Sequence, residues 1–415
     1  MKKIKLKNVV SYSKLRSNHK DLSLETYITT DNLLQNKLGI KIANSLPPNG
    51  DSFPKYINGN ILVSNIRPYL KKIWFANRSG ICSADVLTFE TQTEFSSKFI
   101  YYNLFQDAFF EHMMKGAKGT KMPRGEKNQI LEFEIPDFPF SVQEKIAEFL
   151  SAIDNKIQLN NKINDNLEQM AKTLYDYWFV QFDFPDANGN PYKTSGGKMV
   201  WNEELKREIP EGSEVKPLHK VIETILDHRG KTPKKLGSDW TDDENGIIAL
   251  SAKIVKGGKL NNLRQANKVS KELYNKWMPT KLINGDILMT SEAPAGEFYF
   301  IQGKTDYCMS QRLFGIRANQ LKIISTYLYY ELSKGNGYSQ IMGSLSGSTV
   351  FGIRQDVLRK ILVVIPNLEI QKKFNKIVLP QLKQIKQLDE QNQELASLRD
   401  WLLPMLMNGQ ITVKG

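Results

Sequence analysis

The sequence is poor in the residues that build disulfide frameworks, metal sites and membrane spans. It holds 2 cysteines and 4 histidines in 415 residues, all of them scattered. Cys82 and Cys308 therefore predict neither a disulfide framework nor a zinc site, and we expect both to be small buried side chains. No run of about 18 apolar residues occurs, and the basic start of the chain lacks the apolar stretch of a signal peptide. We expect a cytoplasmic protein without membrane association or bound metal.

Catalytic constellations are missing as well. Asn190-Pro191-Tyr192 is one proline short of the motif of adenine methyltransferases. Gly303-Lys304-Thr305 follows Phe298, where a phosphate loop requires its first glycine. The histidines lie far apart in the sequence, which argues against a nucleophilic or metal site. We therefore expect a non-catalytic chain with no cofactor of its own.

The positive charge is concentrated in two blocks. Of the net charge of +13, residues 1–140 carry +7, residues 141–185 carry −3, residues 186–366 carry +7 and residues 367–415 carry +2. Two equal basic blocks are typical of two polyanion-binding domains, because neutralising phosphates is the main sequence-independent source of DNA affinity. A basic surface that only favours solubility fits the composition equally well.

The two blocks are copies of one unit. The motif Asn58-Gly59-Asn60-Ile61-Leu62 recurs as Asn284-Gly285-Asp286-Ile287-Leu288, and Cys82 recurs as Cys308, both 226 residues later. Later matches, such as Gln143 with Gln371, lie 228 to 230 residues apart, as small loop insertions would produce. The sequence therefore predicts an internal repeat in which each copy is a globular domain followed by a second element.

The second element of each copy is predicted to be a long helix. Apolar residues spaced alternately by four and three form the stripe of a coiled-coil seam. The seam positions are Ile146, Leu150, Ile153, Ile157, Asn160, Asn164, Leu167 and Leu174 in the first helix, and Phe374, Val378, Ile385, Leu388, Asn392, Leu395 and Leu402 in the second. Asn160, Asn164 and Asn392 are polar, so they are candidates for setting the register at some cost in stability.

So narrow an apolar stripe is not stable alone, and each helix needs a partner. Two helices of about 50 Å can bury each other, and an antiparallel pair would carry one globular domain at each end. The alternative is that each helix packs only on its own domain. Pro380 should break or restart the second helix near its first turn.

The globular parts mix strands and helices. Strand-like stretches fall at residues 60–65, 81–89, 287–290 and 362–365, and short helices at 98–114 and 323–333. The predicted organisation is a first domain at 1–140, a helix at 141–183, a linker rich in Pro and Gly at 184–214, a second domain at 215–366, a helix at 367–408 and a tail at 409–415.

Both helical stretches resemble the conserved regions of type I restriction-modification specificity subunits. The stretch from Gln143 to Pro185, with Tyr177-Trp178-Phe179, resembles the central conserved region of that family. The stretch Leu398-Arg399-Asp400-Trp401, continuing to Gly409, is similar to the distal one. The turn at residues 284–288 and Ile66-Arg67-Pro68 are typical of its target-recognition domains. With the repeat, the resemblance covers nearly the whole chain.

The resemblance implies a fold and a function. The fold class is α/β, with two tandem mixed α/β target-recognition domains joined by two long helices that form an antiparallel coiled coil, and with a pseudo-twofold internal repeat. Each domain would read one half of a bipartite site in double-stranded DNA, and the helices would set the spacing. Two methylation subunits, which methylate adenine N6, and two restriction subunits, which cut unmodified DNA, would dock on it. S-adenosylmethionine, ATP and Mg²⁺ are expected in these partners.

The residues expected to contact DNA are basic or small polar side chains in loops. Arginine presents paired donors to guanine, whereas lysine and loop amides more often hold phosphate. The candidates of the first domain are Arg67, Lys71, Lys72, Arg78, Lys115, Lys118, Thr120, Lys121, Arg124 and Lys127, and those of the second are Arg229, Lys231, Lys234, Lys235, Ser291, Arg312, Ser346, Ser348 and Arg354. Each of them could instead be an ordinary solvated residue. Trp240 and Trp277 are expected to be core residues or residues that shape the surface, rather than base-stacking groups.

Two other interpretations are open. A free-standing DNA-binding or regulatory protein with two recognition domains would need no methylation subunits, so co-purification separates it from the family hypothesis. A coiled-coil scaffold without a nucleic-acid role would lack duplex binding that falls steeply with salt.

Overall fold

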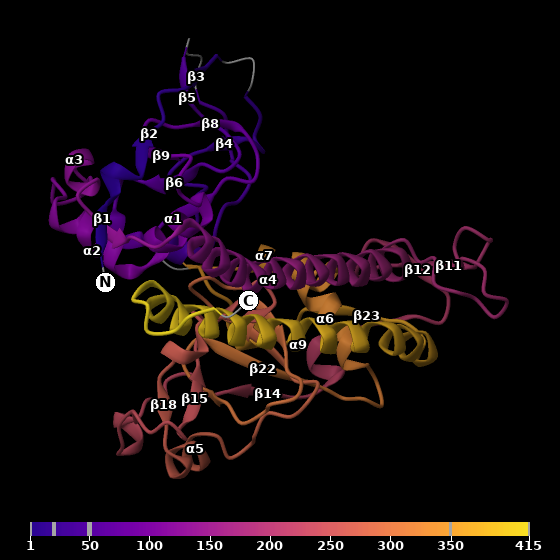
Figure 1. Ribbon diagram of the computed structural model, residues 1–415. Coiled ribbons are helices and arrows are strands. Elements are labelled where there is room, and N and C mark those ends of the chain that lie inside the picture. The colour runs from indigo at the N-terminus through magenta and orange to yellow at the C-terminus, as the bar shows by residue number, and fades with distance from the viewer. Residues whose placement is uncertain (1, 19–21, 48–51, 348–350, 414–415) are drawn as a thin grey trace. The chain divides into compact units, whose positions relative to one another are not determined.

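The computed structural model describes residues 2–18, 22–47, 52–347 and 351–413 (Figure 1). The chain divides into two compact units. The first unit combines Met1–Asn161 with Asp389–Gly415, and the second is Lys162–Leu388. Each unit therefore holds one globular domain together with part of both long helices. Among the described residues no helix is long and apolar enough to cross a membrane.

Two sheets form the globular part of the first unit. An antiparallel sheet has the order β2 (Val10–Tyr12), β9 (Val86–Thr91), β6 (Ile61–Ser64) and β7 (Ile73–Phe75). The other has the order β3 (Arg16–Ser17), β5 (Phe53–Tyr56), β8 (Gly80–Cys82) and β4 (Tyr27–Ile28), with β4 parallel to β8. A further antiparallel pair joins β1 (Lys3–Lys5) to β10 (Glu134–Pro136).

Strand β6 is buried on both faces because successive side chains of a strand point to opposite sides. Ile61 and Val63 join the core that includes the helices, whereas Leu62 joins a smaller core with Cys82 and Trp74. The helices and helical turns of this part are η1 (Leu6–Asn8), η3 (Gln35–Lys37), η4 (Pro68–Leu70), α1 (Ser97–Phe105), α2 (Asp107–Lys115), α3 (Lys127–Ile130) and the start of α4 (Phe140–Tyr175).

The second unit repeats this topology. Its antiparallel sheet has the order β14 (Ile222–Asp227), β22 (Leu313–Ala318), β19 (Ile287–Thr290) and β20 (Phe298–Phe300). A second sheet, β18 (Lys268–Val269), β15 (Ile247–Leu250) and β21 (Cys308–Met309), again contains a parallel pair, β15 with β21. β13 (Glu214–Pro217) pairs with β23 (Leu362–Ile365), as β1 does with β10. The internal repeat predicted from the sequence is confirmed for the four-stranded antiparallel sheet, for the parallel strand pair and for the pair of β13 with β23. The second sheets differ at their edges, with four strands in the first unit and three in the second.

The other elements of the second unit lie around these sheets. They are the π-helical turn η5 (Asp176–Val180), the turns η6 (Leu218–Lys220), η7 (Lys234–Leu236) and η8 (Leu263–Gln265), the pair β16 (Val255–Lys256) and β17 (Lys259–Leu260), and the helices α5 (Lys271–Trp277), α6 (Ser325–Ser333), α7 (Asn336–Gly343) and α8 (Gln355–Leu358). The segment 184–214, expected to be a linker, contains the hairpin of β11 (Met199–Asn202) and β12 (Arg207–Pro210). It also buries Phe184, whose ring stacks on Tyr192.

Two elements expected to be continuous are divided. The strand expected at 81–89 is split into β8 and β9 by a turn at residues 83–85. The helix expected at 98–114 is interrupted at Gln106, whose ψ of 149° is extended, so that α1 and α2 are separate. Both breaks let short elements turn back over the same core, which a pattern of apolar residues alone does not reveal.

The expected break at Pro380 does not occur, because α9 (Leu368–Met407) is continuous through it. Proline removes one backbone hydrogen bond, here the one that would reach the carbonyl of Lys376. Both Pro380 and Lys376 are exposed, so water can satisfy that carbonyl. Phe374, Val378 and Leu382 are buried in one core on either side of the proline and hold the helix together.

Within each unit the segments of α4 and α9 run in opposite directions past each other. In the first unit Asp154 contacts Arg399, and Asn160 donates to Asn392 Oδ1 at 2.9 Å. In the second unit Asn164 lies opposite the carbonyl of Ile385, and the Tyr175 ring lies 6.3 Å from the Phe374 ring. Residue numbers fall on α9 as they rise on α4. Every predicted seam residue is buried or half-buried.

The polar seam residues find partners across the helices. Asn160 is fully buried, and its Nδ2 also donates to Gln391 Oε1 at 2.7 Å. Asn392 in turn donates to Asn161 Oδ1 at 2.9 Å. Because these amides are matched only when Asn160 lies opposite Asn392, they disfavour a slip of the helices past each other.

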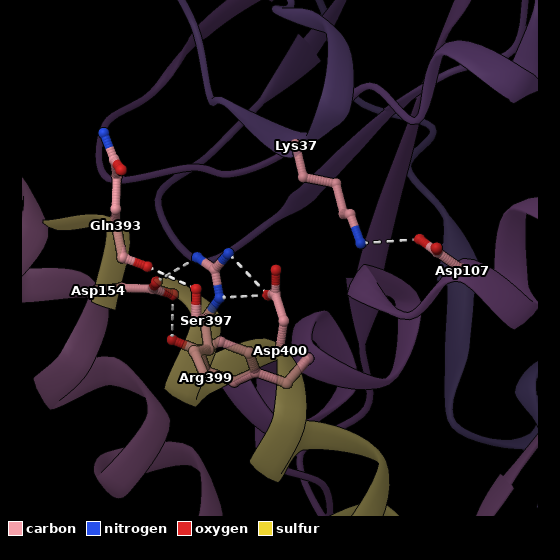
Figure 2. A network of polar contacts seen from close by, with 8 residues as sticks. Lys37, Asp107, Asp154, Gln393, Ser397, Arg399 and Asp400 are labelled. Atoms are coloured by element: carbon pink, nitrogen blue, oxygen red, sulfur yellow. Dashed lines mark hydrogen bonds and ion pairs between the residues drawn. The ribbon is translucent and has the colours of Figure 1, made fainter. Parts of the chain in front are cut away.

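An ion pair joins the same helices in the first unit. Arg399 Nη1 lies 2.7 Å from Asp154 Oδ1, and Tyr102 Oη donates to the other oxygen of Asp154 at 2.7 Å. Asp400 lies on a second side of the guanidinium, as Figure 2 shows. The guanidinium also lies 4.6 Å from the centre of the Phe105 ring. The network ties the end of α9 to both α4 and α1.

A buried acid anchors the end of α4 in the second unit. Glu331 of α6 is 3% exposed, and it accepts hydrogen bonds from Tyr175 Oη and from the backbone N–H of Gly337. Burial raises the pKa of the Glu331 carboxyl above its ordinary value. The contact fixes α4 against α6 and against the turn before α7.

Candidate nucleic-acid interface

In the first domain, two loops after β6 and α2 are joined by backbone hydrogen bonds. Lys118 and Arg124 exchange both N–H···O bonds at 2.9 Å. Gly125 donates to the carbonyl of Asn65, and Arg67 donates to that of Pro123 at 2.8 Å. Arg67 has a φ of 50°, a left-handed conformation that is uncommon for arginine. Residues 65–67 and 115–125 are called the first loop pair.

The second domain builds the same arrangement. Ser346 and Gly352 exchange both backbone hydrogen bonds at 3.0 Å, and Ile353 donates to the carbonyl of Ser291 at 2.9 Å. Ala293 has a φ of 54° and precedes a proline, as Arg67 does. Residues 291–293, 343–347 and 351–353 are called the second loop pair. The strand repeat therefore extends to the loops that the sequence singled out by their glycines and basic residues.

The first loop pair is strongly basic. Six of the predicted DNA-contacting residues in and beside it are exposed, namely Lys115, Lys118, Thr120, Lys121, Arg124 and Lys127. Arg67 is half-buried. Arg124 lies 3.0 Å from Asp85. Because this ion pair is exposed and therefore weak, a DNA phosphate can replace Asp85 as the partner of Arg124 at little cost in free energy. This surface has the charge and the loop amides that bind phosphate.

The second loop pair has lost most of that charge. Ser346 stands where the first copy has Lys118, Gly352 where it has Arg124, and Ala293 where it has Arg67. Ser346 is exposed. The position of Asp85 is taken by Arg312. Asp85 directly precedes β9, the partner of β6, and its carbonyl accepts a hydrogen bond from Asn65, the residue after β6. Arg312 directly precedes β22, the partner of β19, and its carbonyl accepts a hydrogen bond from Ser291, the residue after β19. The two copies therefore present the same backbone with different charges.

Three arginines near the second loop pair are each paired with an acid. Arg312 lies 2.9 Å from Glu292, and Arg354 lies 3.5 Å from Asp356. Arg229 donates two hydrogen bonds to Asp227, at 2.9 and 2.8 Å, and stacks 4.2 Å from the centre of the Phe314 ring. Arg229 and Arg312 are held in position by these contacts, which suits recognition of one base edge better than general attraction to phosphate.

Grooves at corresponding edges of the main sheets differ in the same way. The groove of the first domain, about 230 Å³, is lined by Lys14, Arg16, Lys55 and Lys127. The groove of the second, about 720 Å³, is lined by Asp227, Arg229, Glu292 and Gln355. The sequence reading missed Lys14, Arg16 and Lys55. β2 pairs with β9 in the first domain as β14 pairs with β22 in the second, and this correspondence aligns Arg16 with Arg229. Because Arg229 was a predicted contact residue, the alignment could have pointed to Arg16 as well.

Several predicted contact residues are engaged inside their own domain. Lys71 lies 2.8 Å from Asp107, and Arg78 donates to the carbonyl of Glu25 at 2.8 Å. Lys72 donates to the carbonyl of Thr30, and burial lowers its pKa. Their part in DNA binding stays a prediction, but their geometry shows a structural role.

The second domain has similar cases. Lys231 donates to the carbonyl of Trp277 and Lys235 to that of Gly230, both at 2.8 Å, while Lys234 is exposed. Ser291 is 1% exposed, so its hydroxyl lies beneath the surface, where a bound duplex cannot reach it. Ser348 lies outside the described residues. The part of Ser291 in DNA binding, like that of the other candidates, stays a prediction.

The cysteines and tryptophans can also be placed. Cys82 and Cys308 are both buried and unbonded to each other, as predicted, and burial raises the pKa of their thiols to about 11 and about 12. Trp277 is 1% exposed, in agreement with the expected core position. Trp240 is 44% exposed, so it is not a core residue, and its expected part in shaping the surface stays a prediction. In the described parts of the chain no three His, Cys, Asp or Glu residues are grouped to hold a metal ion.

Known proteins share this organisation. The family described as the type I restriction modification DNA specificity domain matches residues 2–169 and 210–397. The HindI specificity subunit of Haemophilus influenzae is 24% identical over 436 aligned residues, which cover 93% of this chain and 94% of that protein. The MjaIX specificity subunit of Methanocaldococcus jannaschii is 24% identical over 323 residues, 77% of this chain and 70% of that protein.

A solved structure shows the same fold. The crystal structure of the S subunit of a type I restriction-modification system from M. genitalium matches with a TM-score of 0.56 at 18% sequence identity. The match covers 98% of this chain and 96% of that one. Since the family domain occurs twice and spans most of the sequence, the chain belongs to the family of type I restriction-modification DNA specificity subunits.

Proposed function

We propose that each globular domain reads one half of a bipartite site in double-stranded DNA, and that the paired helices set the distance between the halves. The observation that carries this proposal is the loop pair itself. The same hydrogen-bonded loops occur at the same place in both domains, while the side chains they present differ. A constant backbone with variable polar side chains is what two readers of different sequences require.

The helices supply the surface on which methylation subunits would dock. Large apolar side chains remain exposed on their outer faces, among them Leu159 and Met170 of α4 and Leu398 and Trp401 of α9, at 52%, 58%, 44% and 59%. Exposed apolar groups along a helix mark an interaction face. We propose that two methylation subunits, which modify adenine N6, bind there and that two restriction subunits join them.

Chemistry is assigned to the partners under this proposal. S-adenosylmethionine, ATP and Mg²⁺ would be bound by the methylation and restriction subunits, and this chain would be a non-catalytic subunit. A free-standing DNA-binding protein is the competing function. Co-expression with the methylation subunit tests it, because the proposal expects one stable complex and the alternative expects separate elution.

The basic first loop pair gives a quantitative test. Exchanging Lys115, Lys118, Lys121 and Arg124 for glutamine should weaken binding of the complex to its site at least tenfold, because four cations that can neutralise phosphates are lost. The negative slope of log K against log salt should also become less steep, by roughly 0.9 for each lost phosphate contact. A variant with Lys193, Lys198, Lys206 and Lys220 exchanged for glutamine is the control, because these exposed lysines lie outside both loop pairs. Fluorescence anisotropy across a salt series measures both quantities.

The outcome separates the two levels of the proposal. Equal slopes and affinities for the loop variant and the control would place the interface elsewhere on the domain. Binding that does not weaken with salt would contradict DNA reading by this chain.

A further inference from the structure

The second domain holds a pocket beside its loop pair. Its volume is about 590 Å³, and Trp240, Trp277, Lys231, Lys253 and Arg312 are among its lining residues. Ala293 of the second loop pair lines it too. Pockets that bind small molecules measure roughly 300–1,000 Å³. This pocket can therefore hold one nucleoside, whereas a duplex is too wide to enter it.

One wall of the pocket is aromatic. Trp240 is 44% exposed, and its ring centre lies 6.1 Å from that of Trp277, which is 1% exposed. The buried indole backs the exposed one and restricts its movement. An exposed indole held in this way is a stacking surface for a base, because every nucleobase has a flat face.

The rest of the lining is positively charged and polar. Lys231, Lys253 and Arg312 contribute cations, and no Asp or Glu is among the lining residues. Hydroxyl and amide groups, such as those of Ser251 and Asn267, supply donors and acceptors for a base edge. This chemistry matches an uncharged aromatic ring that carries a phosphate, and it does not match an apolar or cationic ligand.

The pocket adjoins the second loop pair directly. Ser291 donates its backbone N–H to the carbonyl of Arg312 at 2.9 Å, and both Ala293 and Arg312 line the pocket. These two residues have left-handed φ values of 54° and 69°. Strained backbone of this kind occurs preferentially at ligand-binding positions. A ligand in the pocket would thus lie next to the loops assigned to DNA.

We propose that this pocket receives a single nucleobase unstacked from the half-site that the second domain reads. Trp240 stacks on the base, and the exposed Lys253 holds the phosphate beside it. The inference rests on the proposed function. It also assigns an asymmetry, because the first 140 residues contain one tryptophan, Trp74, which is 9% exposed. The first domain therefore offers no exposed tryptophan, among its described residues, on which such a base could stack.

Binding of the methylation complex to duplexes with an abasic site tests the proposal. The recognition sequence is first obtained from mapped methylation, and one position of the second half-site at a time is then made abasic. When the abasic site lies opposite the extruded base, no base pair has to be broken for extrusion. The wild-type complex should therefore bind the duplex that is abasic at that one position more tightly than the intact duplex. Trp240→Ala should lose this rise and bind the intact site about tenfold or more weakly, since a base loses its stacking partner.

Three comparisons make the result decisive. Trp201→Ala removes another exposed indole, at 57% exposure on β11, and should bind within about twofold of wild type. Trp240→Phe keeps a ring and should retain most of the affinity, which separates stacking from misfolding. In a third experiment the complex is titrated with free deoxynucleoside monophosphates while tryptophan fluorescence is monitored. Saturable quenching would show that the pocket binds a soluble nucleotide.

The failures are distinguishable. Wild-type affinity and an unchanged abasic profile in Trp240→Ala would overturn the pocket while leaving DNA reading intact. Saturable quenching by a free monophosphate, without any position at which an abasic site strengthens binding, would also overturn the extruded base. A wild-type complex that recognises no duplex would overturn the proposed function and this inference together.

Discussion

Arg399→Ala is expected to destabilise the first unit by about 3 kcal/mol. The side chains of Arg399 and Asp154 are 14% and 18% exposed, so removing the arginine leaves a nearly buried carboxylate without its ion-pair partner. Tyr102 still donates to Asp154, which keeps the loss at the lower end of the range for buried pairs. Hydrogen exchange of peptides from α1 and α4 measures the change.

The matched control for this substitution is Arg354→Ala. Its partner Asp356 lies 3.5 Å away, and the two side chains are 75% and 61% exposed, so the loss should be no more than about 0.5 kcal/mol. The double variant Arg399→Ala with Asp154→Asn should recover part of the stability by removing the unpaired charge. Equal, small losses for Arg399→Ala and Arg354→Ala would show that the network does not hold α9 to α4.

Removing one heptad from each long helix is expected to change the DNA sequence that the complex recognises. Deleting residues 160–166 of α4 together with 386–392 of α9 shortens each helix by about 10 Å, or about 3 base pairs of duplex. A seven-residue deletion nearly preserves the rotational phase of a helix, so the remaining seam residues can still pair. The unspecified gap between half-sites should shrink by about 3 base pairs.

A variant of unchanged length serves as the control for the deletion. Exchanging Asn160 and Asn392 for leucine removes their hydrogen bond but keeps both helices at full length. Its gap should equal that of the wild type, although its register is less strictly set. Methylation mapping reads the gap in both variants. An unaltered gap after the double deletion would contradict the role of the helices as spacers.

The repeat and the helices were readable from the sequence because they depend on local patterns. The Asn-Gly turn before β6 and β19 recurs at a constant offset, and seam residues such as Ile153 and Val378 recur every three or four positions. Such periodicity can be recognised in a single sequence, without knowledge of the three-dimensional structure. Pro380 misled for the same reason, since a local rule predicted a break that packing on both sides of the proline prevents.

The details of the candidate interface were not readable because they depend on distant residues. Lys71 was classed with the free cations, yet its partner Asp107 lies 36 positions away. The replacement of Asp85 by Arg312 became visible only through strand register. Trp240 was expected to be a core or shape-defining residue because large aromatic side chains are mostly buried, and only the assembled pocket shows its exposed face.

Mapping methylated adenines in a cell that expresses this chain with its methylation subunit is the most direct test of the whole account. The account predicts one bipartite motif, with a modified adenine in each half and a gap of fixed length without sequence preference between them. A single uninterrupted motif, or the same methylation pattern when this chain is absent, would contradict it.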